Sequence, residues 1–233
     1  KHEATESPNV VGVLRGSDPV LAKEYVVLSA HLDHLGIGAP REGDAIYNGA
    51  YDNASGTAGI LEIARALTRL PRAPRRSILF AFWDGEEMGM LGSRDWFKHP
   101  TVPSDSIRLA INIDMVGRNK CDSPAEANTL YLVGSDRIST ELHQINEQAN
   151  RALMNPLTLD YTLNDPADLE SLYTRSDHYS YASKGVPIIF FFNGHHEDYH
   201  KPSDHPGKID AEKESRIMRM NFWLGLESAN GPM

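Results

Sequence analysis

The sequence predicts an α/β protein of three layers, α/β/α, with a mostly parallel, mixed sheet between two layers of helices. Strand-like and helix-like segments alternate along the 233 residues, which is the order typical of such a sheet. Two strand-like runs, SILFAFW at 77–83 and VPIIFFF at 186–192, are almost entirely apolar, as expected of strands covered on both faces. The length fits one domain with a sizeable core.

Six strands and five helices are expected in chain order. The strands are apolar runs bounded by turn residues, at 9–14, 25–30, 77–83, 108–113, 130–133 and 186–192. The helices are expected at 55–70, 89–98, 138–153, 176–183 and 210–228, and in the first of them apolar residues recur at helical spacing. Asn53 or Ser55 can cap the first helix, and Pro71 ends it. The stretches 116–128 and 155–175 have neither pattern and are expected to be loops.

The composition limits the kinds of partner. With 23 basic and 32 acidic residues the chain has a net charge of −9, which argues against a nucleic-acid partner. No apolar stretch approaches the roughly 20 residues that are needed to cross a bilayer. Cys121 is the single cysteine, so no disulfide can form within the chain.

Residues of the kinds that bind metals follow several of the strand-like runs. They are His31 and Asp33 in AHLDH, Glu86 and Glu87 in FWDGEE, Asp114 in INIDMVG, His200 in DYHKPSD, and Asp52 in the glycine-rich turn GAYDNASG. Because side chains beyond the carboxyl ends of parallel strands meet in one crevice, we expect these residues to converge. Imidazoles and carboxylates without thiolates favour a zinc site that catalyses hydrolysis over a closed structural site.

These residues also have ordinary structural explanations. The two acids of DGEE can open a helix, where the helix dipole favours them, and Asp52 can be a turn or N-cap residue. The alternative for Glu86 and Glu87 is that one binds a metal while the other acts as a general base. Asp33, two residues after His31 along a strand, can orient that imidazole.

A competing motif overlaps the last of these segments. The residues from His196 to His200 read HEDYH, which matches the H-E-x-x-H pattern of mononuclear zinc proteases. That motif requires a helix, which puts both histidines on one face. Gly194 before it and Pro202 after it leave too few residues for a stable helix, so we expect His195 and His196 to lie in a loop near the crevice.

In their order along the chain, these fragments resemble the co-catalytic dizinc aminopeptidases, metallopeptidase family twenty-eight. The resemblance runs from residue 9 to the C-terminal helix and rests on NVVGVL, AHLDH, GAYDNASG, FWDGEEMGMLGS, NIDMVG, RSDHYSYASKGVPI and DYHKPSD. Each fragment alone is loose, whereas seven in the family's order are specific. The resemblance implies the zinc-exopeptidase fold, a peptide substrate and two zinc ions per chain.

The resemblance also implies which residues bind the metals. One zinc ion would bind His31 and Asp114, and the other would bind Glu87 and His200. Asp52 would bridge the two ions and would precede a non-proline cis peptide bond.

Further matched positions imply the catalytic and substrate-binding residues. Asp33 would support the neighbouring zinc-binding imidazole. Glu86 would take a proton from the attacking water and give it to the leaving amine, and Tyr199 would donate a hydrogen bond to the tetrahedral oxyanion. The Arg175 carbonyl and Glu86 would hold the free amine of the substrate, and Phe192 would form an apolar wall of the first side-chain pocket.

The chain departs from the family at its N-terminal side. Members usually carry a helical segment and a strand before the NVVGVL position, and many insert a protease-associated domain. Residues 1–233 are therefore expected to form a single zinc peptidase catalytic domain without these parts. Apolar surface that the missing helices would cover is then exposed, repacked or buried in a homo-oligomer. The resemblance favours a secreted or periplasmic location.

The expected function is a zinc aminopeptidase that removes N-terminal, apolar residues from peptides. Two other activities on the same fold stay open. One is a glutaminyl cyclase, which uses one zinc ion. The other is a carboxypeptidase or dipeptidase, in which Arg118 or Arg175 would bind the substrate carboxylate. A receptor-like relative without activity would have lost ligands, whereas every matched position is filled here.

Overall fold

The central sheet of the computed structural model, which describes residues 6–231, has seven strands in the order β1-β5-β2-β6-β9-β7-β8. They are β1 Val10–Leu14, β2 Tyr25–His31, β5 Ser77–Trp83, β6 Ile107–Ile113, β7 Thr129–Val133, β8 Thr158–Asp160 and β9 Ile188–Phe192. β5, β2, β6 and β9 run parallel, β1 is antiparallel to β5, and β7 is antiparallel to β9. The prediction of a mostly parallel, mixed sheet is confirmed.

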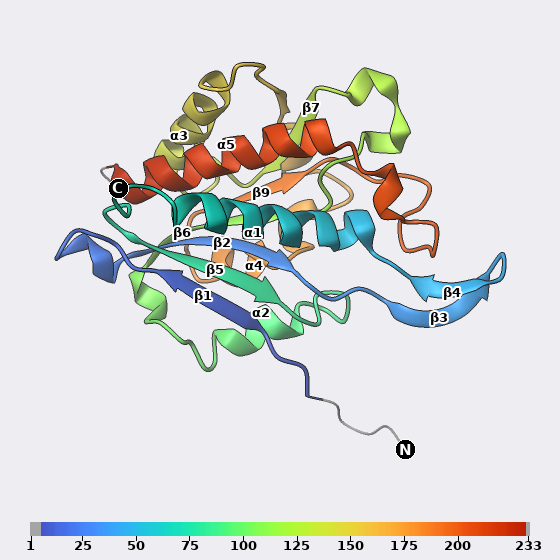
Figure 1. Ribbon diagram of the computed structural model, residues 1–233, viewed down its shortest axis with the longest axis horizontal. Coiled ribbons are helices and arrows are strands. Elements are labelled where there is room, and N and C mark those ends of the chain that lie inside the picture. The colour runs from blue at the N-terminus through green and yellow to red at the C-terminus, as the bar shows by residue number, and fades with distance from the viewer. Residues whose placement is uncertain (1–5, 232–233) are drawn as a thin grey trace.

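Helices cover both faces of this sheet. They are α1 Ser55–Leu67, α2 Leu91–Trp96, α3 Thr140–Arg151, α4 His178–Ala182 and α5 Ala211–Asn230. In β2, Val26 and Leu28 pack in one core cluster with α1, α3 and α5, whereas Val27 packs with Trp96 of α2 and Tyr181 of α4. This alternation is the period of two that a strand imposes on its side chains. Figure 1 shows α1 and α5 lying side by side across the front of the sheet.

Two parts of the fold differ from the expectation. The stretch 155–175, expected to be a loop, contains the edge strand β8, which is only three residues long. Before α1 the chain forms a hairpin of β3 Gly36–Arg41 and β4 Asp44–Tyr47, which lies outside the central sheet and projects from the body (Figure 1). Neither has a buried face long enough to impose an apolar pattern.

The ends of the helices follow from local contacts. Asn53 Oδ1 accepts a hydrogen bond from the Gly56 N–H at the start of α1, and Ser139 caps α3 through the Leu142 N–H. α2 is shorter than expected because Met90, with φ of 60°, is in the left-handed region directly before it. In the described part of the chain, no helix has the length and apolar character to span a membrane.

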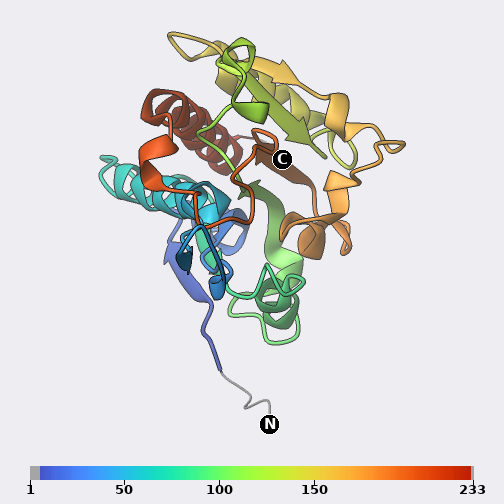
Figure 2. The same ribbon diagram turned by 90° about the vertical axis from the view of Figure 1, so that its right-hand side faces the viewer.

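The carboxyl ends of β5, β2, β6 and β9 lie at the same edge of the sheet, because these strands are parallel. The arrows of β2 and β5 point to the right in Figure 1, and this side faces the viewer in Figure 2. The hairpin and the start of α1 lie at the same edge. Ligands in such sheets bind beyond these strand ends, so the candidate site is expected here.

Candidate metal centre

The five predicted metal ligands come from five segments that meet at this edge. His31 ends β2, Asp114 follows β6, Glu87 lies in the turn after β5, His200 lies in the loop after β9, and Asp52 lies in the short π-helical turn Ala50–Ala54 before α1. The peptide bond from Asp52 to Asn53 is cis, as the resemblance implied.

Asp52 lies between two groups of side chains. Its Oδ1 is 3.1 Å from His31 Nε2, which is also 3.2 Å from Asp114 Oδ1. Its Oδ2 is 3.1 Å from His200 Nε2, which is also 3.1 Å from Glu87 Oε2. Each oxygen of one carboxylate therefore faces a different imidazole and a different second carboxylate.

This donor set fits two cations that share Asp52. The nearest ligand atoms of a tetrahedral zinc ion, each about 2.0–2.1 Å from the metal, are about 3.3 Å apart, close to the four distances around Asp52. His200 Nε2 is buried yet has no hydrogen-bond partner among the described residues, so it is free to bind a metal. Carboxylate and imidazole ligands without sulfur suit zinc in a hydrolytic site.

The two imidazoles are held in a strongly acidic environment. Burial lowers the pKa of His200, but the carboxylates of Asp52 and Glu87, each 3.1 Å from its Nε2, outweigh burial and raise that pKa to about 10. Burial also lowers the pKa of His31, but the charge of Asp114 outweighs burial and holds that pKa well above its ordinary value. The same contacts with His200 and His31 hold the pKa of Asp52 below its usual range despite burial. The pocket therefore favours positive charge.

Asp33 orients His31 as expected, but through its backbone carbonyl more than through its carboxylate. Its backbone carbonyl accepts the Nδ1–H of His31 at 3.0 Å, while its carboxylate oxygen is 3.5 Å from the same nitrogen. The carboxylate accepts hydrogen bonds from the backbone N–H groups of Glu86 and Glu87 at 3.1 and 3.2 Å. Asp33 thus fixes the tautomer that leaves Nε2 of His31 for a metal and also positions the DGEE turn.

Two other residues hold the candidate ligands from outside. The Asp204 carboxylate accepts hydrogen bonds from the backbone N–H groups of Tyr51 and Asp52, at 3.0 and 3.3 Å. Ser176 donates a hydrogen bond of 2.8 Å from its hydroxyl to Asp114 Oδ2. Bonds of this kind restrict the carboxylates to one orientation.

Glu86 lies close to these residues, and its pKa is shifted far from the ordinary value. Burial, followed by the charge of Asp114, raises the pKa of Glu86 to about 9. With this pKa the group is protonated at neutral pH, and cations bound beside it would lower the pKa toward the range in which a carboxyl group can both accept and return a proton.

The remaining predicted residues lie near His200. The ring of Tyr199 stacks on His200 with centroids 3.9 Å apart, and burial raises the pKa of the Tyr199 hydroxyl above its ordinary value. Phe192 is buried, and its ring meets His195 edge to face at 5.4 Å. The Arg175 side chain is exposed, and its charge lowers the pKa of Tyr199 in opposition to burial.

The HEDYH segment is a loop that ends in a turn, as expected, and not a helix. The buried ring of His196 packs on Tyr51, and its Nδ1 accepts a hydrogen bond from the Asp198 N–H. His200 is in the left-handed region with φ of 55°, which no α-helix contains. The two histidines therefore do not share a helical face, and the motif of mononuclear zinc proteases is absent.

A third group of potential ligands, Asp122, His196 and Asp198, is already neutralised. The guanidinium of Arg118 contacts Asp122 at 2.7 Å and Asp198 at 2.9 Å, and Lys208 donates to Asp198 at 2.7 Å. These cations occupy the carboxylates that a metal would need. The side chain of Arg118 is 4% exposed and engaged in these ion pairs, which argues against its expected alternative role as a clamp for a substrate carboxylate.

One further residue, which the sequence did not single out, lies among the candidate ligands. His34 Nδ1 is 2.8 Å from Glu87 Oε1, and His34, Asp52 and Glu87 form one of the groups that could hold a metal. The sequence pattern AHLDH contains this histidine, but the strand period that relates His31 to Asp33 does not include it.

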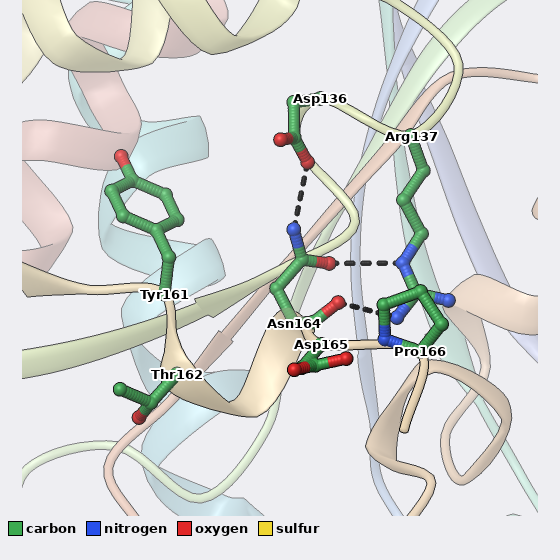
Figure 3. Close-up of a pocket in the computed structure, with 7 residues that line it drawn as sticks. All are labelled: Asp136, Arg137, Tyr161, Thr162, Asn164, Asp165 and Pro166. Carbon is green, nitrogen blue, oxygen red and sulfur yellow. Dashed lines mark hydrogen bonds between the residues drawn. The ribbon is translucent and has the colours of Figure 1, made fainter. Parts of the chain in front are cut away.

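A pocket lies away from these residues. It has a volume of about 790 Å³ and is lined by Asp136, Arg137, Tyr161, Thr162, Asn164, Asp165 and Pro166 (Figure 3). Asn164 donates to Asp136 at 2.7 Å and accepts from Arg137 Nε at 3.0 Å. These side chains satisfy one another across the loop that follows β7, so the pocket is better explained as a loop junction than as a second site.

Several known proteins are similar to this chain in sequence, in fold or in both. The chain is 31% identical over 199 residues to the "probable leucine aminopeptidase 2" of Aspergillus oryzae, covering 83% of this chain and 35% of that protein. The LapA aminopeptidase of Legionella pneumophila superposes with a TM-score of 0.75 at 22% identity, covering 97% of this chain and 56% of that one. The glutaminyl cyclase of Porphyromonas gingivalis superposes with a TM-score of 0.72 at 22% identity, covering 93% and 76%.

These similarities extend over most of the chain. The chain spans only about a third of the length of two curated relatives. It covers 37% of one of them and 35% of the other. A family model matches residues 9–223, which include every candidate residue described above. The chain belongs to peptidase family M28.

Proposed function

We propose that this chain carries the catalytic site of a zinc aminopeptidase that uses two zinc ions to remove apolar N-terminal residues from peptides. The chain is a peptidase of a family whose named members include aminopeptidases, and zinc is the metal named among its structural neighbours. The observation that carries the two-ion proposal is the position of Asp52, which directs one oxygen to His31 and the other to His200.

The proposed ligands divide between the two ions. His31 and Asp114 would hold one ion, Glu87 and His200 would hold the other, and Asp52 would bridge them. Two zinc ions held in this way would lower the pKa of a shared water and polarise the scissile carbonyl. The contacts from Asp33, Asp204 and Ser176 support this assignment, because they fix the ligands before any metal binds.

Glu86 is the proposed general base and acid. Two cations bound beside Glu86 would lower its pKa from about 9 toward neutrality, where the carboxylate can take a proton from the attacking water and pass that proton to the leaving amine. Tyr199, stacked on His200, is proposed to donate a hydrogen bond from its hydroxyl to the oxyanion.

The substrate is proposed to bind through its free N-terminus. The Arg175 carbonyl and the Glu86 carboxylate would receive the α-amino group, and Phe192 would contribute an apolar wall for the first side chain. The buried position of Phe192 next to His195 supports an apolar pocket beside the proposed metals.

A panel of free and blocked substrates tests this function. Leucine 4-nitroanilide should be hydrolysed, whereas N-acetyl-leucine 4-nitroanilide should not, because acetylation removes the amine that the site would hold. A chelator should abolish hydrolysis of leucine 4-nitroanilide, and added zinc should restore it. Glutamyl and lysyl anilides should be cleaved more slowly than the leucyl substrate if the first pocket is apolar.

Other results would favour the alternative activities. Cyclisation of N-terminal glutaminyl peptides without anilide hydrolysis would identify a glutaminyl cyclase. Trimming of an N-acetylated peptide from its C-terminus would identify a carboxypeptidase. Full activity after complete removal of metal would contradict the zinc mechanism altogether.

A further inference from the structure

His34 lies inside the candidate metal centre but has no role in the five-ligand assignment. It follows His31 by three residues, beyond the end of β2, and its side chain is only 8% exposed. A buried histidine normally satisfies its ring nitrogens with hydrogen bonds. Neither ring nitrogen of His34 has a hydrogen-bond partner among the described residues.

The contacts of His34 suit a metal ligand, because it lies with Asp52 and Glu87 in one group of potential ligands. Its Nδ1 is 2.8 Å from Glu87 Oε1, and that oxygen is also buried without a hydrogen-bond partner. Two such atoms at this separation repel one another unless a proton or a cation lies between them. The two atoms do not meet the geometry of a hydrogen bond, and a cation that both contact would relieve their repulsion.

His200 provides an internal comparison. Its Nε2 is likewise buried without a hydrogen-bond partner, while it lies 3.1 Å from Asp52 Oδ2 and 3.1 Å from Glu87 Oε2. His34 and His200 therefore approach the same two carboxylates in the same unpaired state. Their rings are edge to face at 72° with centroids 5.6 Å apart, so they reach the carboxylates from different directions.

The distances allow one ion to contact His34, Asp52 and Glu87 together. Two ligands of a zinc ion with bonds of about 2.0–2.2 Å can be at most about 4.4 Å apart. His34 Nδ1 is 2.8 Å from the nearest oxygen of Glu87 and 4.0 Å from Asp52 Oδ2. We propose that His34 Nδ1 is an additional ligand of the ion bound by Glu87, His200 and Asp52.

This inference rests on the two-zinc site proposed above. It implies that the two zinc ions have different numbers of protein ligands. The half at His31 would have one imidazole, whereas the half at His200 would have two. The second half would then bind zinc through four side chains and hold it more tightly, while the first would keep more open positions for water and substrate. The two zinc ions should accordingly leave in two separate steps on titration with a chelator.

The test measures metal binding, independent of activity. X-ray absorption at the zinc edge of the wild-type protein loaded with two zinc ions should give three imidazoles per two zinc ions, from His31, His34 and His200. In His34→Ala loaded to the same level, the count should fall to two. Competition with a calibrated chelator should show that one of the two zinc ions binds at least about 100-fold more weakly in this variant. His99→Ala is the matched control, because His99 is 77% exposed and distant in sequence from every proposed ligand.

His34→Gln distinguishes a ligand from a residue that only orients Glu87. A glutamine amide can donate a hydrogen bond to Glu87 but cannot replace an imidazole ligand, so zinc affinity should stay as weak as in His34→Ala. Two imidazoles per two zinc ions in the wild type, or wild-type affinity in His34→Gln, would overturn the inference while leaving the two-zinc function intact. A wild-type protein that binds fewer than two zinc ions would overturn both.

Discussion

At the scale of single residues, the site depends on the orientation of one carboxylate. Asp52 can face two imidazoles because the Asp204 carboxylate accepts hydrogen bonds from the Tyr51 and Asp52 N–H groups. Asp204 is held in turn near Arg118, whose Nη1 is 3.9 Å from its carboxylate. A series of contacts thus connects the buried guanidinium of Arg118, through Asp204, to the backbone of the proposed bridging ligand.

Glu86→Gln tests the proposed base at this scale. The substitution preserves size but removes the group that takes up a proton, so kcat should fall by roughly 10²–10⁴-fold while KM changes little. Zinc content should stay at the wild-type level, because Glu86 is not among the proposed ligands. The measurement is leucine 4-nitroanilide hydrolysis together with metal analysis of the same preparation. Near-normal turnover would remove Glu86 from the base role, and loss of zinc would make it a ligand.

Single residues also mark how far sequence reasoning reaches. The positions of His31, Asp52 and Asp114 could be matched from short motifs, because each adjoins a strand end or a glycine-rich turn. The contact between His34 and Glu87 could not, since it depends on how the loop after β2 turns toward the loop after β5. The engagement of Arg118 in buried ion pairs was hidden for the same reason.

At the scale of elements, the parallel strands were the predictable part of the fold. β5 and β9 are buried at every position, and such continuous apolar runs are visible in the sequence. The β3–β4 hairpin was not predicted, because every residue of β3 is exposed and no apolar alternation marks it. β8, with three residues, is shorter than any pattern can identify.

The partly buried carboxyl group of Glu214 in α5 should make the free energy of unfolding depend on pH. Burial raises its pKa from an ordinary 4.5 to about 7, so the folded chain keeps this proton where the unfolded chain has lost it. Stability that is present below about pH 4.5 is therefore lost as the pH rises toward 7. Glu214→Gln stays neutral, so its free energy of unfolding relative to the wild type should rise by on the order of 1 kcal/mol over this range, allowing for solvent screening.

Urea unfolding at pH 5 and pH 8, with chelator present in both, measures this change. Glu227→Gln is the matched control in the same helix, because Glu227 is exposed and its carboxylate is already in water. A difference between Glu214→Gln and the wild type that is equal at the two pH values would contradict the assigned cause.

At the scale of the whole molecule, the sheet concentrates acidic groups at one edge. Asp52, Asp114 and Glu87 meet there, and the buried carboxyls of Glu86 and Asp177 have their pKa values raised to about 9 and about 7, mainly by burial. So many carboxyl groups in one pocket oppose folding when no cation is present. The proposed metals would thus stabilise the fold as well as supply chemistry.

Removal of metal should therefore lower the thermal stability of the entire domain. A ligand that binds only the native state, at about 1,000 times its dissociation constant, adds about 4 kcal/mol. For a chain of this size, 1 kcal/mol corresponds to roughly 2–4 °C in Tm, so chelation should lower Tm by about 10 °C. Calorimetry of the zinc-loaded and chelated protein measures this shift, and added zinc should reverse it. Because Asp52→Asn weakens the proposed bridge, its Tm should respond much less to the chelator than the wild type. Equal Tm values for the loaded and chelated wild type would show that no metal is bound where these five segments meet.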